Sequence, residues 1–349
     1  MEMNDLLHAA VDCGASDVLL VTGAPPMFRI RGVLEQAPMD PLSPRDVEEL
    51  CRQVLQEPQR AALDRDQDAD FSVAVPRLGR FRFNVHRQRG SYAAAIRHVP
   101  GQVPTLDSLN LPPCVEELTR LHHGLVLVTG QTGSGKSTTV AAMLEQINQH
   151  DAKHIITLED PIEFQFNHAR SVIEQREIGA DCPTFASGLR HVLRQDPDVI
   201  FVGELRDLET IRTALQAAET GHLVFATLHS SSAAGSIDRI IDVFPAGEQT
   251  QIRTHLAETL RGVVTQRLLP ALDGRRAVAA EVLVVTRPIQ TSIREGTTHL
   301  IPGLMQTGRR SGMQTLEQAL RELVLNGRVT DEVANEHLQE LTRLAGAPV

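Results

Sequence analysis

The sequence predicts an α/β protein with two domains, and three observations support this. Its 349 residues are about twice the length of an ordinary domain. Residues 1–98 combine helical periodicity with strands that alternate apolar and polar residues. After a segment with four prolines at 100–113, short apolar strands alternate with longer helices, as in a parallel sheet covered by helices. We therefore expect a first domain at 1–99, a linker at 100–113 and a second domain at 114–349.

The first domain is expected to mix two helices with several strands. In the segment at 80–85, Phe81 and Phe83 share one face, which should be buried, and Arg80 and Arg82 share the other. The helix near 43 has a start signal, because serine is a common N-cap residue and proline suits the first turn. The expected helices are 3–13 and 43–56, and the expected strands are 17–21, 27–33, 71–75, 80–85 and 92–99.

The second domain is expected to hold strands that are apolar on both faces, followed by a helical C-terminal part from about residue 288. No apolar run approaches the roughly 20 residues that span a bilayer, and the chain starts with acidic rather than basic residues. We therefore expect a cytoplasmic protein without a transmembrane segment. The expected strands are 125–129, 155–158, 199–202 and 223–227, and the C-terminal helices are 288–295, 315–326 and 330–344.

The composition argues against several classes of partner. The net charge is −10, from 34 basic and 44 acidic residues, so the overall field repels nucleic acid and anionic lipid. The net charge does not exclude a local basic face on the surface. Aromatic residues make up only 3 %, which leaves few platforms for stacking bases. The four cysteines are far apart in the sequence and form no CxxC motif, so we expect reduced thiols and no cysteine-ligated zinc.

The most specific local motif is a phosphate-binding loop at 130–137, which reads G-x-x-x-x-G-K-S. An apolar strand precedes it and a helical pattern follows it, as the motif requires. Its glycines let backbone N–H groups surround phosphate oxygens, Lys136 reaches the β- and γ-phosphates, and Ser137 can ligate Mg²⁺. The sequence therefore predicts binding of ATP with Mg²⁺. The expected ligands are Gly130, Thr132, Gly133, Ser134, Gly135, Lys136, Ser137 and Thr138.

Acidic residues follow two of the expected strands, at the edge where parallel sheets place nucleotide chemistry. Glu159, Asp160 and Glu163 follow the strand at 155–158, and Glu204 follows the strand at 199–202. Transfer of a phosphoryl group to water needs a carboxylate at the metal and a group that orients the water. Either cluster can supply these groups, with a solvated acidic turn as the alternative for each. Glu204 is the stronger candidate, because it directly follows a strand of the buried type.

Histidines flank the strand at 223–227. His229 follows its carboxyl end, so it should lie at the same edge as the phosphate-binding loop, where it could contact a γ-phosphate. A histidine that only satisfies local hydrogen bonds is an equally good interpretation of this position. His222 precedes the strand.

The first domain contains a run of arginines between residues 77 and 97. Three interpretations are open for them: a stripe that binds nucleic acid, a solvated face, or an arginine finger that reaches ATP on a neighbouring domain or subunit. We favour the arginine finger, because the loop-bearing domain has few positive groups near its motifs. The residues are Arg77, Arg80, Arg82, Arg87, Arg89 and Arg97.

Together these motifs resemble the type II/IV secretion ATPase superfamily, and specifically the twitching-motility retraction ATPases of type IV pili (PilT-like). The resemblance covers nearly the whole chain. Residues 16–17 and 23–27 resemble the N-terminal signature of the family, and residues 293–296 resemble its C-terminal segment linked to retraction. Four ordered boxes match at the right separations: Gly130–Thr138 (Walker A), Ile156–Phe164 (Asp box), Arg194–Asp207 (Walker B) and Gly221–His229 (His box).

The resemblance implies a PAS-like first domain, a RecA-like second domain and a homohexameric ring with ATP near each interface. It implies a motor that powers pilus retraction at the cytoplasmic face of the inner membrane, acting on a membrane platform protein and not on nucleic acid. The implied catalytic residues are Glu204, Glu159, Glu163, His229, Arg82 and Arg97, with Asp160 and His222 at the nucleotide and Ser137 and Glu204 at Mg²⁺.

The chain departs from the family pattern at two places. The N-terminal signature reads Ser16-Asp17-Val18-Leu19-Leu20, without the usual histidine, and Gly203 stands where other Walker B motifs have aspartate, a substitution typical of this family. Assembly ATPases usually add N-terminal domains and a four-cysteine module, which this sequence lacks. An accessory retraction paralogue, a DNA translocase and a small-molecule kinase remain the alternatives.

Overall fold

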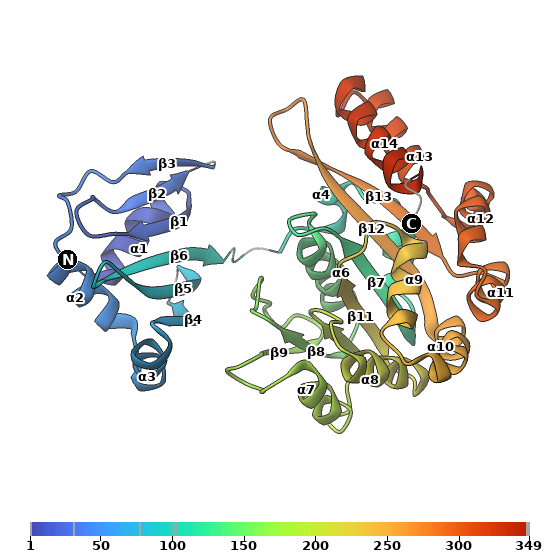
Figure 1. Ribbon diagram of the computed structural model, residues 1–349, viewed down its shortest axis with the longest axis horizontal. Coiled ribbons are helices and arrows are strands. Elements are labelled where there is room, and N and C mark those ends of the chain that lie inside the picture. Colours follow the sequence, from blue (N-terminus) through green and yellow to red (C-terminus); the bar gives the residue numbers. More distant parts are fainter. Residues whose placement is uncertain (1, 31, 77, 100, 102, 347–349) are drawn as a thin grey trace. The chain divides into compact units, whose positions relative to one another are not determined.

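The computed structural model describes residues 2–346 except Arg31, Arg77, Pro100 and Gln102. The chain divides into two compact units (Figure 1). The first comprises Met1–Gln102 with Glu163–Gln165, and the second comprises Val103–Ile162 with Phe166–Val349. Both units combine sheets with helices, so the predicted α/β class is confirmed.

The first unit is built on one antiparallel sheet, which has six strands among the described residues, in the order β3-β2-β1-β6-β5-β4. Its strands are β1 (Ala15–Leu20), β2 (Met27–Ile30), β3 (Val33–Gln36), β4 (Asp68–Val75), β5 (Gly79–Gln88) and β6 (Ser91–Val99). Its helices are α1 (Met3–Asp12), α2 (Pro44–Val54) and α3 (Glu57–Asp66).

The core of the first unit lies between the sheet and these helices. Phe81 and Phe83 are buried in it together with Leu6 of α1 and Leu50 of α2, while Arg82 is exposed. The predicted burial of Phe81 and Phe83 is therefore confirmed, and of the two arginines on the other face Arg82 is exposed while Arg80 is half-buried. The alternation arises because successive side chains of a strand point to opposite sides of the sheet.

Two predictions for the first unit need correction. The expected single strand at 27–33 is a hairpin of β2 and β3, with Gly32 at a φ of 86° in its turn. Helix α3 was not predicted, because only Leu63 of its ten residues is buried and its sequence has little apolar periodicity. The start of α2 is confirmed: Ser43 accepts from the backbone N–H of Asp46, whose carboxylate accepts from the N–H of Ser43.

The second unit is built on a sheet with seven strands among the described residues, in the order β13-β12-β7-β11-β10-β8-β9. All neighbouring strands in it are parallel except β12 and β13. The strands are β7 (Gly124–Gly130), β8 (His154–Glu159), β9 (Val172–Glu177), β10 (Val199–Val202), β11 (Leu223–Leu228), β12 (Leu260–Pro270) and β13 (Arg276–Val284).

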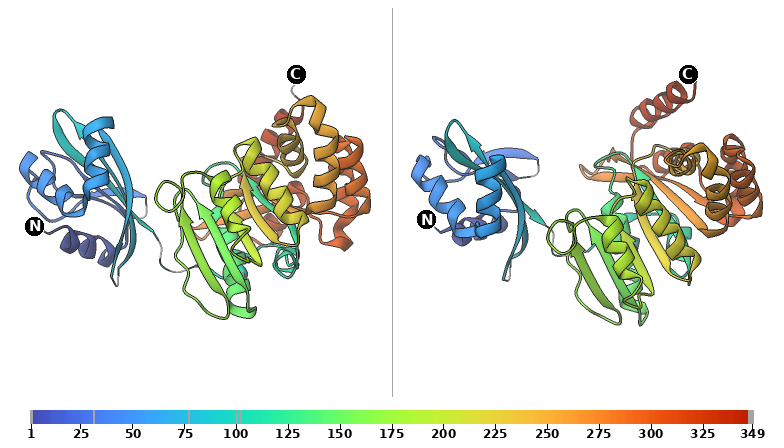
Figure 2. Two further views of the ribbon diagram at one scale, coloured as in Figure 1. Left: turned by 90° about the horizontal axis from the view of Figure 1, so that it is seen from below. Right: turned by 60° about the horizontal axis from the view of Figure 1, so that its bottom comes forward.

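Helices cover both faces of this sheet. They are α4 (Leu106–Leu109), α5 (Cys114–Thr119), α6 (Lys136–His150), α7 (Phe185–Val192), α8 (Leu208–Glu219), α9 (Ala233–Asp242), α10 (Ala246–Thr259), α11 (Arg287–Glu295), α12 (Ile301–Thr307), α13 (Leu316–Leu325) and α14 (Asp331–Gly346), with the 3₁₀ turns η1 (Thr298–Leu300) and η2 (Gly308–Ser311). The helices that follow β13 in the sequence lie on the side of the sheet where β13 is the edge strand, away from the other edge strand, β9 (Figures 1 and 2).

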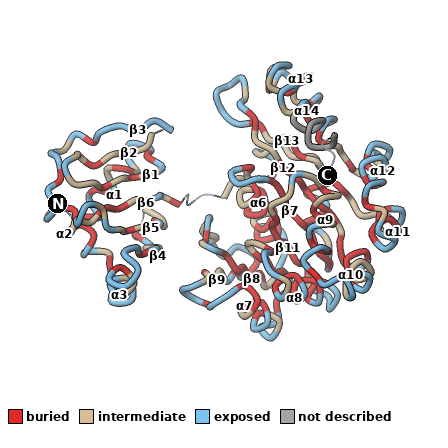
Figure 3. Tube along the Cα trace, in the orientation of Figure 1, coloured by how far each residue is buried: buried red, intermediate tan, exposed pale blue. Residues whose placement is uncertain are grey.

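The central strand β7 shows why these strands lack a polar face. Leu125 and Leu127 belong to the core cluster that includes residues of α7 to α10, whereas Val126 and Val128 belong to the cluster that includes residues of α5 and α6. Every residue of β7, β10 and β11 is buried (Figure 3). The apolar runs at 125–129, 199–202 and 223–227 therefore form the predicted parallel strands, with both faces covered.

The rest of the second unit departs from the predicted elements in detail. The strands β9, β12 and β13 were not predicted, and α4 lies inside the segment expected to be a linker. Of the described helices, none is both long and apolar enough to cross a membrane.

Candidate nucleotide-binding site

The glycine-rich loop connects the carboxyl end of β7 to the start of α6. Its turn needs backbone conformations that favour glycine, because φ is 145° at Gly130, 79° at Gly133 and 90° at Gly135. At Gly130 the space is also closed, since an added Cβ would lie 2.5 Å from the carbonyl oxygen of Gln266 in β12. The β7 edge therefore accepts only glycine where the loop begins.

The loop has the features of an anion site. Gly135 is the N-cap of α6 and provides no side-chain acceptor, so the first backbone N–H groups of this 15-residue helix have no side-chain cap. Ser134 Oγ is buried and has no hydrogen-bond partner among the described residues. Ser137 and Thr138 lie half-buried in the first turn of α6. These groups fit the phosphates of a nucleotide, with the Ser137 hydroxyl available to Mg²⁺.

Lys136 is folded back onto the loop. Its side chain is buried, and Nζ donates to the carbonyl oxygens of Gly130 at 2.9 Å and Gln131 at 3.0 Å. Burial lowers the pKa of Lys136, an effect that the negative charge of Glu204 partly offsets. The ammonium group is thus held at the mouth of the loop, where an incoming phosphate can replace the two carbonyl oxygens.

Glu204 lies at the same edge of the sheet, directly after β10. Its Oε2 forms an ion pair with Arg206 Nη2 at 2.7 Å, and its Oε1 lies 3.4 Å from His229 Nε2, after β11. Burial alone would raise the pKa of Glu204, but the hydrogen bond and charge of Arg206, with the charges of His229 and Lys136, outweigh it and lower the pKa. Glu204 is therefore a charged carboxylate, 19 % exposed, among three basic side chains.

The turn after β10 explains the glycine at 203. The N–H of Gly203 donates to the carbonyl oxygen of Leu158 at 2.7 Å. A Cβ at this position would lie 3.0 Å from that oxygen and 3.3 Å from Glu159 Cα. The turn is also tied to β11, because the Thr227 hydroxyl donates to the carbonyl of Gly203. Close packing of β8 against β10 thus crowds any side chain at this position, where other Walker B motifs carry aspartate.

The acidic residues after β8 have different surroundings. Glu159 is buried, and its Oε1 accepts hydrogen bonds from the Thr157 hydroxyl at 2.7 Å and from Gln175 Nε2, in β9, at 3.0 Å. Asp160 is exposed at the end of β8, and its charge acts on Arg206. Glu163 is exposed and is grouped with the first unit. Of these three, the structure brings Asp160 towards the Glu204 cluster and ties Glu159 to β9.

His222 lies at the amino end of the parallel strands, whereas the loop lies at their carboxyl end. The prediction that His222 contacts the nucleotide is therefore wrong for a nucleotide bound to the loop of the same chain. Its Nδ1 is 3.0 Å from the carbonyl oxygen of Ala217 and 3.2 Å from the Thr220 hydroxyl. The six residues of β11 separate it from His229. A strand of that length spans about 20 Å, which is too far for both histidines to contact one phosphate.

The arginines of the first unit form a pair on its sheet. Arg82 in β5 lies directly opposite Arg97 in β6, and Arg97 Nε donates to Asp17 Oδ1, in β1, at 2.8 Å. Both guanidinium groups are exposed. Arg77, which belongs to the same run, lies outside the described residues. The structure therefore brings Arg82 and Arg97 together with Asp17 on one surface.

Two parts of the site were not predicted from the sequence. The first is Arg206, the ion-pair partner of Glu204, although its position two residues after the glutamate could have indicated it.

The second is a depression beside the loop. It is lined by Gln131–Ser134, by Gln266–Pro270 of β12 and by Arg276 of β13. The sequence could not indicate it, because β12 and β13 come to the loop only through the order of strands in the sheet.

The parallel sheet with a phosphate loop at its carboxyl edge defines a RecA-like P-loop ATPase domain. The chain belongs to the type II/IV secretion system protein family, whose model matches residues 4–345. The predicted resemblance of the chain to this superfamily is thereby confirmed.

Three relatives illustrate the match. The chain is 46 % identical to the uncharacterized protein YggR of Escherichia coli K12 over 94 % of this chain and 100 % of that protein. It is 43 % identical to the type IV pilus retraction ATPase PilT of Pseudomonas aeruginosa over 96 % of this chain and 98 % of that protein. A crystal structure of the pilus retraction motor PilT with bound ADP matches it with a TM-score of 0.91 and 47 % identity over 96 % of each chain.

Proposed function

We propose that this chain is the subunit of a homohexameric ATP-hydrolysing motor that powers retraction of type IV pili. The observation that carries the proposal is the convergence of Lys136, Glu204 and His229 at one edge of a parallel sheet. The similarity to retraction ATPases over nearly the whole chain supports the choice of motor.

In this proposal the loop residues from Gly130 to Thr138 bind the phosphates of ATP. Lys136 exchanges its two carbonyl partners for phosphate oxygens. Ser137 and, in part through water, Glu204 would hold Mg²⁺, which would neutralise phosphate charge. Glu204 also orients the attacking water, and His229 lies beside it to contact the γ-phosphate. The nucleoside end extends into the depression beside β12, on the side of the loop away from Glu204.

The first unit is proposed to complete the site of a neighbouring subunit. Arg82 and Arg97 supply positive charge to the transferring phosphoryl group, and Glu163 and Asp160 assist at the same interface. The ring works at the cytoplasmic face of the inner membrane, where its partner is a platform protein of the pilus machinery. An accessory retraction or assembly motor of the same family is the nearest alternative, ahead of a DNA translocase.

The enzymatic part is tested by phosphate release from Mg·ATP with purified hexamer, for the wild type and Glu204→Gln. We expect the variant to bind nucleotide while its turnover falls at least about a hundredfold, because it loses the group that orients water. Normal turnover in the variant would exclude Glu204 from the reaction. Stimulation of the wild type by DNA would move the translocase alternative to the front.

The motor part is tested in cells. In a strain that lacks its own retraction ATPase, expression of this chain should restore the twitching zone on agar, and Glu204→Gln should not. A hydrolysing hexamer that fails to restore twitching there, but restores surface pili in a strain that lacks its assembly ATPase, would favour the assembly motor over the retraction motor.

A further inference from the structure

The carboxylate of Glu204 has a basic group at each of its oxygens. Oε2 faces Arg206 Nη2 at 2.7 Å, and Oε1 faces His229 Nε2 at 3.4 Å. The first distance is that of a strong charge-assisted hydrogen bond, and the second is longer than a normal one. Arg206 is therefore the group that holds this carboxylate, and His229 is a weaker neighbour.

This ion pair competes with the proposed work of Glu204 at the nucleotide. Its proposed work needs a carboxylate oxygen to meet the metal-bound water or the attacking water, and Arg206 occupies Oε2. Lys136 is engaged in the same way by the carbonyl oxygens of its own loop. The two groups that the proposed reaction needs are thus both held by partners from the chain itself.

The side chain of Arg206 is able to leave this ion pair. Its side chain is 63 % exposed, whereas Glu204 is only 19 % exposed, so the guanidinium group can move while the carboxylate stays. Asp160, exposed at the end of the neighbouring strand β8, already acts on Arg206 through its charge. The negative charge of Asp160 thus also acts on the guanidinium group that Glu204 binds.

We propose that Arg206 is a latch on Glu204: it holds the carboxylate through the ion pair at Oε2, and binding of Mg·ATP requires its release. This inference rests on the proposed function of the site. Arg206 is a positioning residue in this scheme, because it acts through Glu204 and not on the nucleotide.

Nucleotide binding tests the latch without turnover. We compare Arg206→Gln with the wild type by calorimetric titration of Mg·AMP-PNP, a non-hydrolysable ATP analogue, and of ADP without metal. Removing a partly exposed ion pair should tighten Mg·AMP-PNP binding by about threefold to tenfold. Binding of metal-free ADP, which does not engage Glu204, should stay within about twofold of the wild type. Equal or weaker Mg·AMP-PNP binding by the variant overturns the latch.

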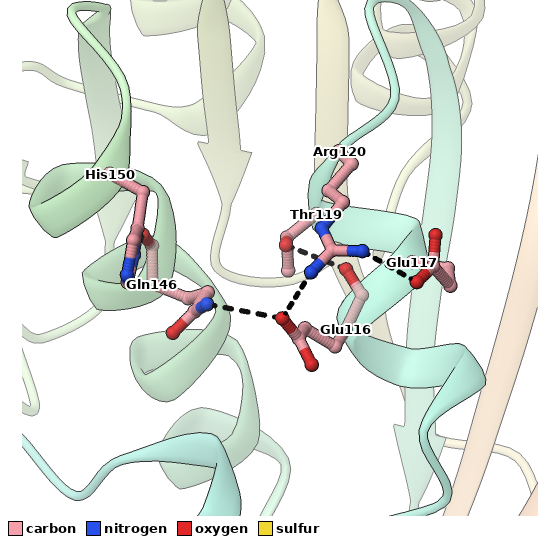
Figure 4. Close-up of polar contacts among 6 residues, drawn as sticks. All are labelled: Glu116, Glu117, Thr119, Arg120, Gln146 and His150. Atoms are coloured by element: carbon pink, nitrogen blue, oxygen red, sulfur yellow. Dashed lines mark hydrogen bonds and ion pairs between the residues drawn. The ribbon is translucent and has the colours of Figure 1, made fainter.

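A matched control is available at the opposite edge of the sheet. Arg120 follows α5, ahead of β7, and forms ion pairs with Glu116 at 2.6 Å and Glu117 at 2.7 Å (Figure 4). Its side chain is 60 % exposed, close to the value for Arg206. Arg120→Gln should leave the affinity for both nucleotides unchanged. A gain in this control equal to that of Arg206→Gln would show a general effect of removing surface charge and would overturn the latch.

A double-mutant cycle tests whether Arg206 acts through Glu204. In the Glu204→Gln background the latch has already lost its charged partner, so adding Arg206→Gln should change Mg·AMP-PNP affinity less than twofold. A full gain in that background would mean that Arg206 acts elsewhere. Failure of the latch is distinct from failure of the proposed function, because the wild type must in any case bind and hydrolyse ATP.

Discussion

At the scale of single residues, the site depends on which charged groups are buried and what holds them. Lys136 shows this most directly, since it is one of only two lysines and is buried against its own loop. An arginine cannot take its place, because a planar guanidinium group does not fit where a compact ammonium group must meet phosphate oxygens.

We predict that Lys136→Ala lowers kcat/KM for ATP by about a hundredfold or more, because the phosphates lose their cation. The other lysine provides the control: Lys153, just before β8, is 36 % exposed and pairs with Asp198, just before β10. Lys153→Ala should hydrolyse ATP at the wild-type rate. Phosphate release on samples of equal hexamer content measures both variants, and equal losses in the two would refute the role of Lys136.

A second prediction concerns the thiols. Burial raises the pKa of Cys51, in α2, to about 12, so only about one in ten thousand of these thiols is ionised at pH 8. Cys13 is exposed at the end of α1. We expect a thiol reagent at pH 8 to label Cys13 within minutes and to leave Cys51 unmodified until the first unit unfolds. Peptide mapping by mass spectrometry reads both sites, and early labelling of Cys51 would contradict its burial.

At the scale of elements, the contact between β8 and β10 aligns the two acidic turns. The N–H of Gly203 bonds to Leu158, and β10 pairs in parallel register with β8. The strands themselves were predictable, because their residues are apolar on both faces. The close approach of their ends was not, because it depends on two segments more than forty residues apart in the sequence.

We predict that Gly203→Ala destabilises the second unit by about 1–3 kcal/mol, because the new methyl group crowds Leu158 and Glu159. The variant should also hydrolyse ATP more slowly, since the turn that carries Glu204 is displaced. Gly247→Ala in α10 is the control: nothing lies within 4 Å of its added Cβ, so its stability should be unchanged or higher by up to about 1 kcal/mol. Urea unfolding compares them; a Gly203→Ala midpoint equal to the wild type would rule out crowding.

At the scale of the whole molecule, the proposed ring makes activity depend on assembly. The carboxylate and the loop belong to the second unit, while Arg82 and Arg97 belong to the first. A site completed by a neighbouring subunit should be inactive in a monomer, and its specific activity should rise with protein concentration as rings form.

We predict that Arg97→Ala assembles normally but hydrolyses ATP about a thousandfold more slowly, as expected for loss of an arginine finger. Arg87→Ala is the matched control, because Arg87 is likewise exposed, on the neighbouring strand β5, and lies over the ring of Tyr92 at 4.4 Å. Activity against concentration, with light scattering on the same samples, separates assembly from chemistry. A fully active monomer, or an active Arg97→Ala ring, would refute the shared site.

The sequence alone determined the class of this protein, because the properties involved are local. The glycine loop, the apolar strands and the Ser43 cap each depend on residues within one short segment, and the four boxes together indicated the family. Only the tertiary structure decided which groups meet. It joined Arg206 and His229 to Glu204, turned Glu159 towards β9, and placed His222 at the far edge of the sheet. Those contacts follow from the order and direction of strands, and strand order arises from packing between segments distant in sequence.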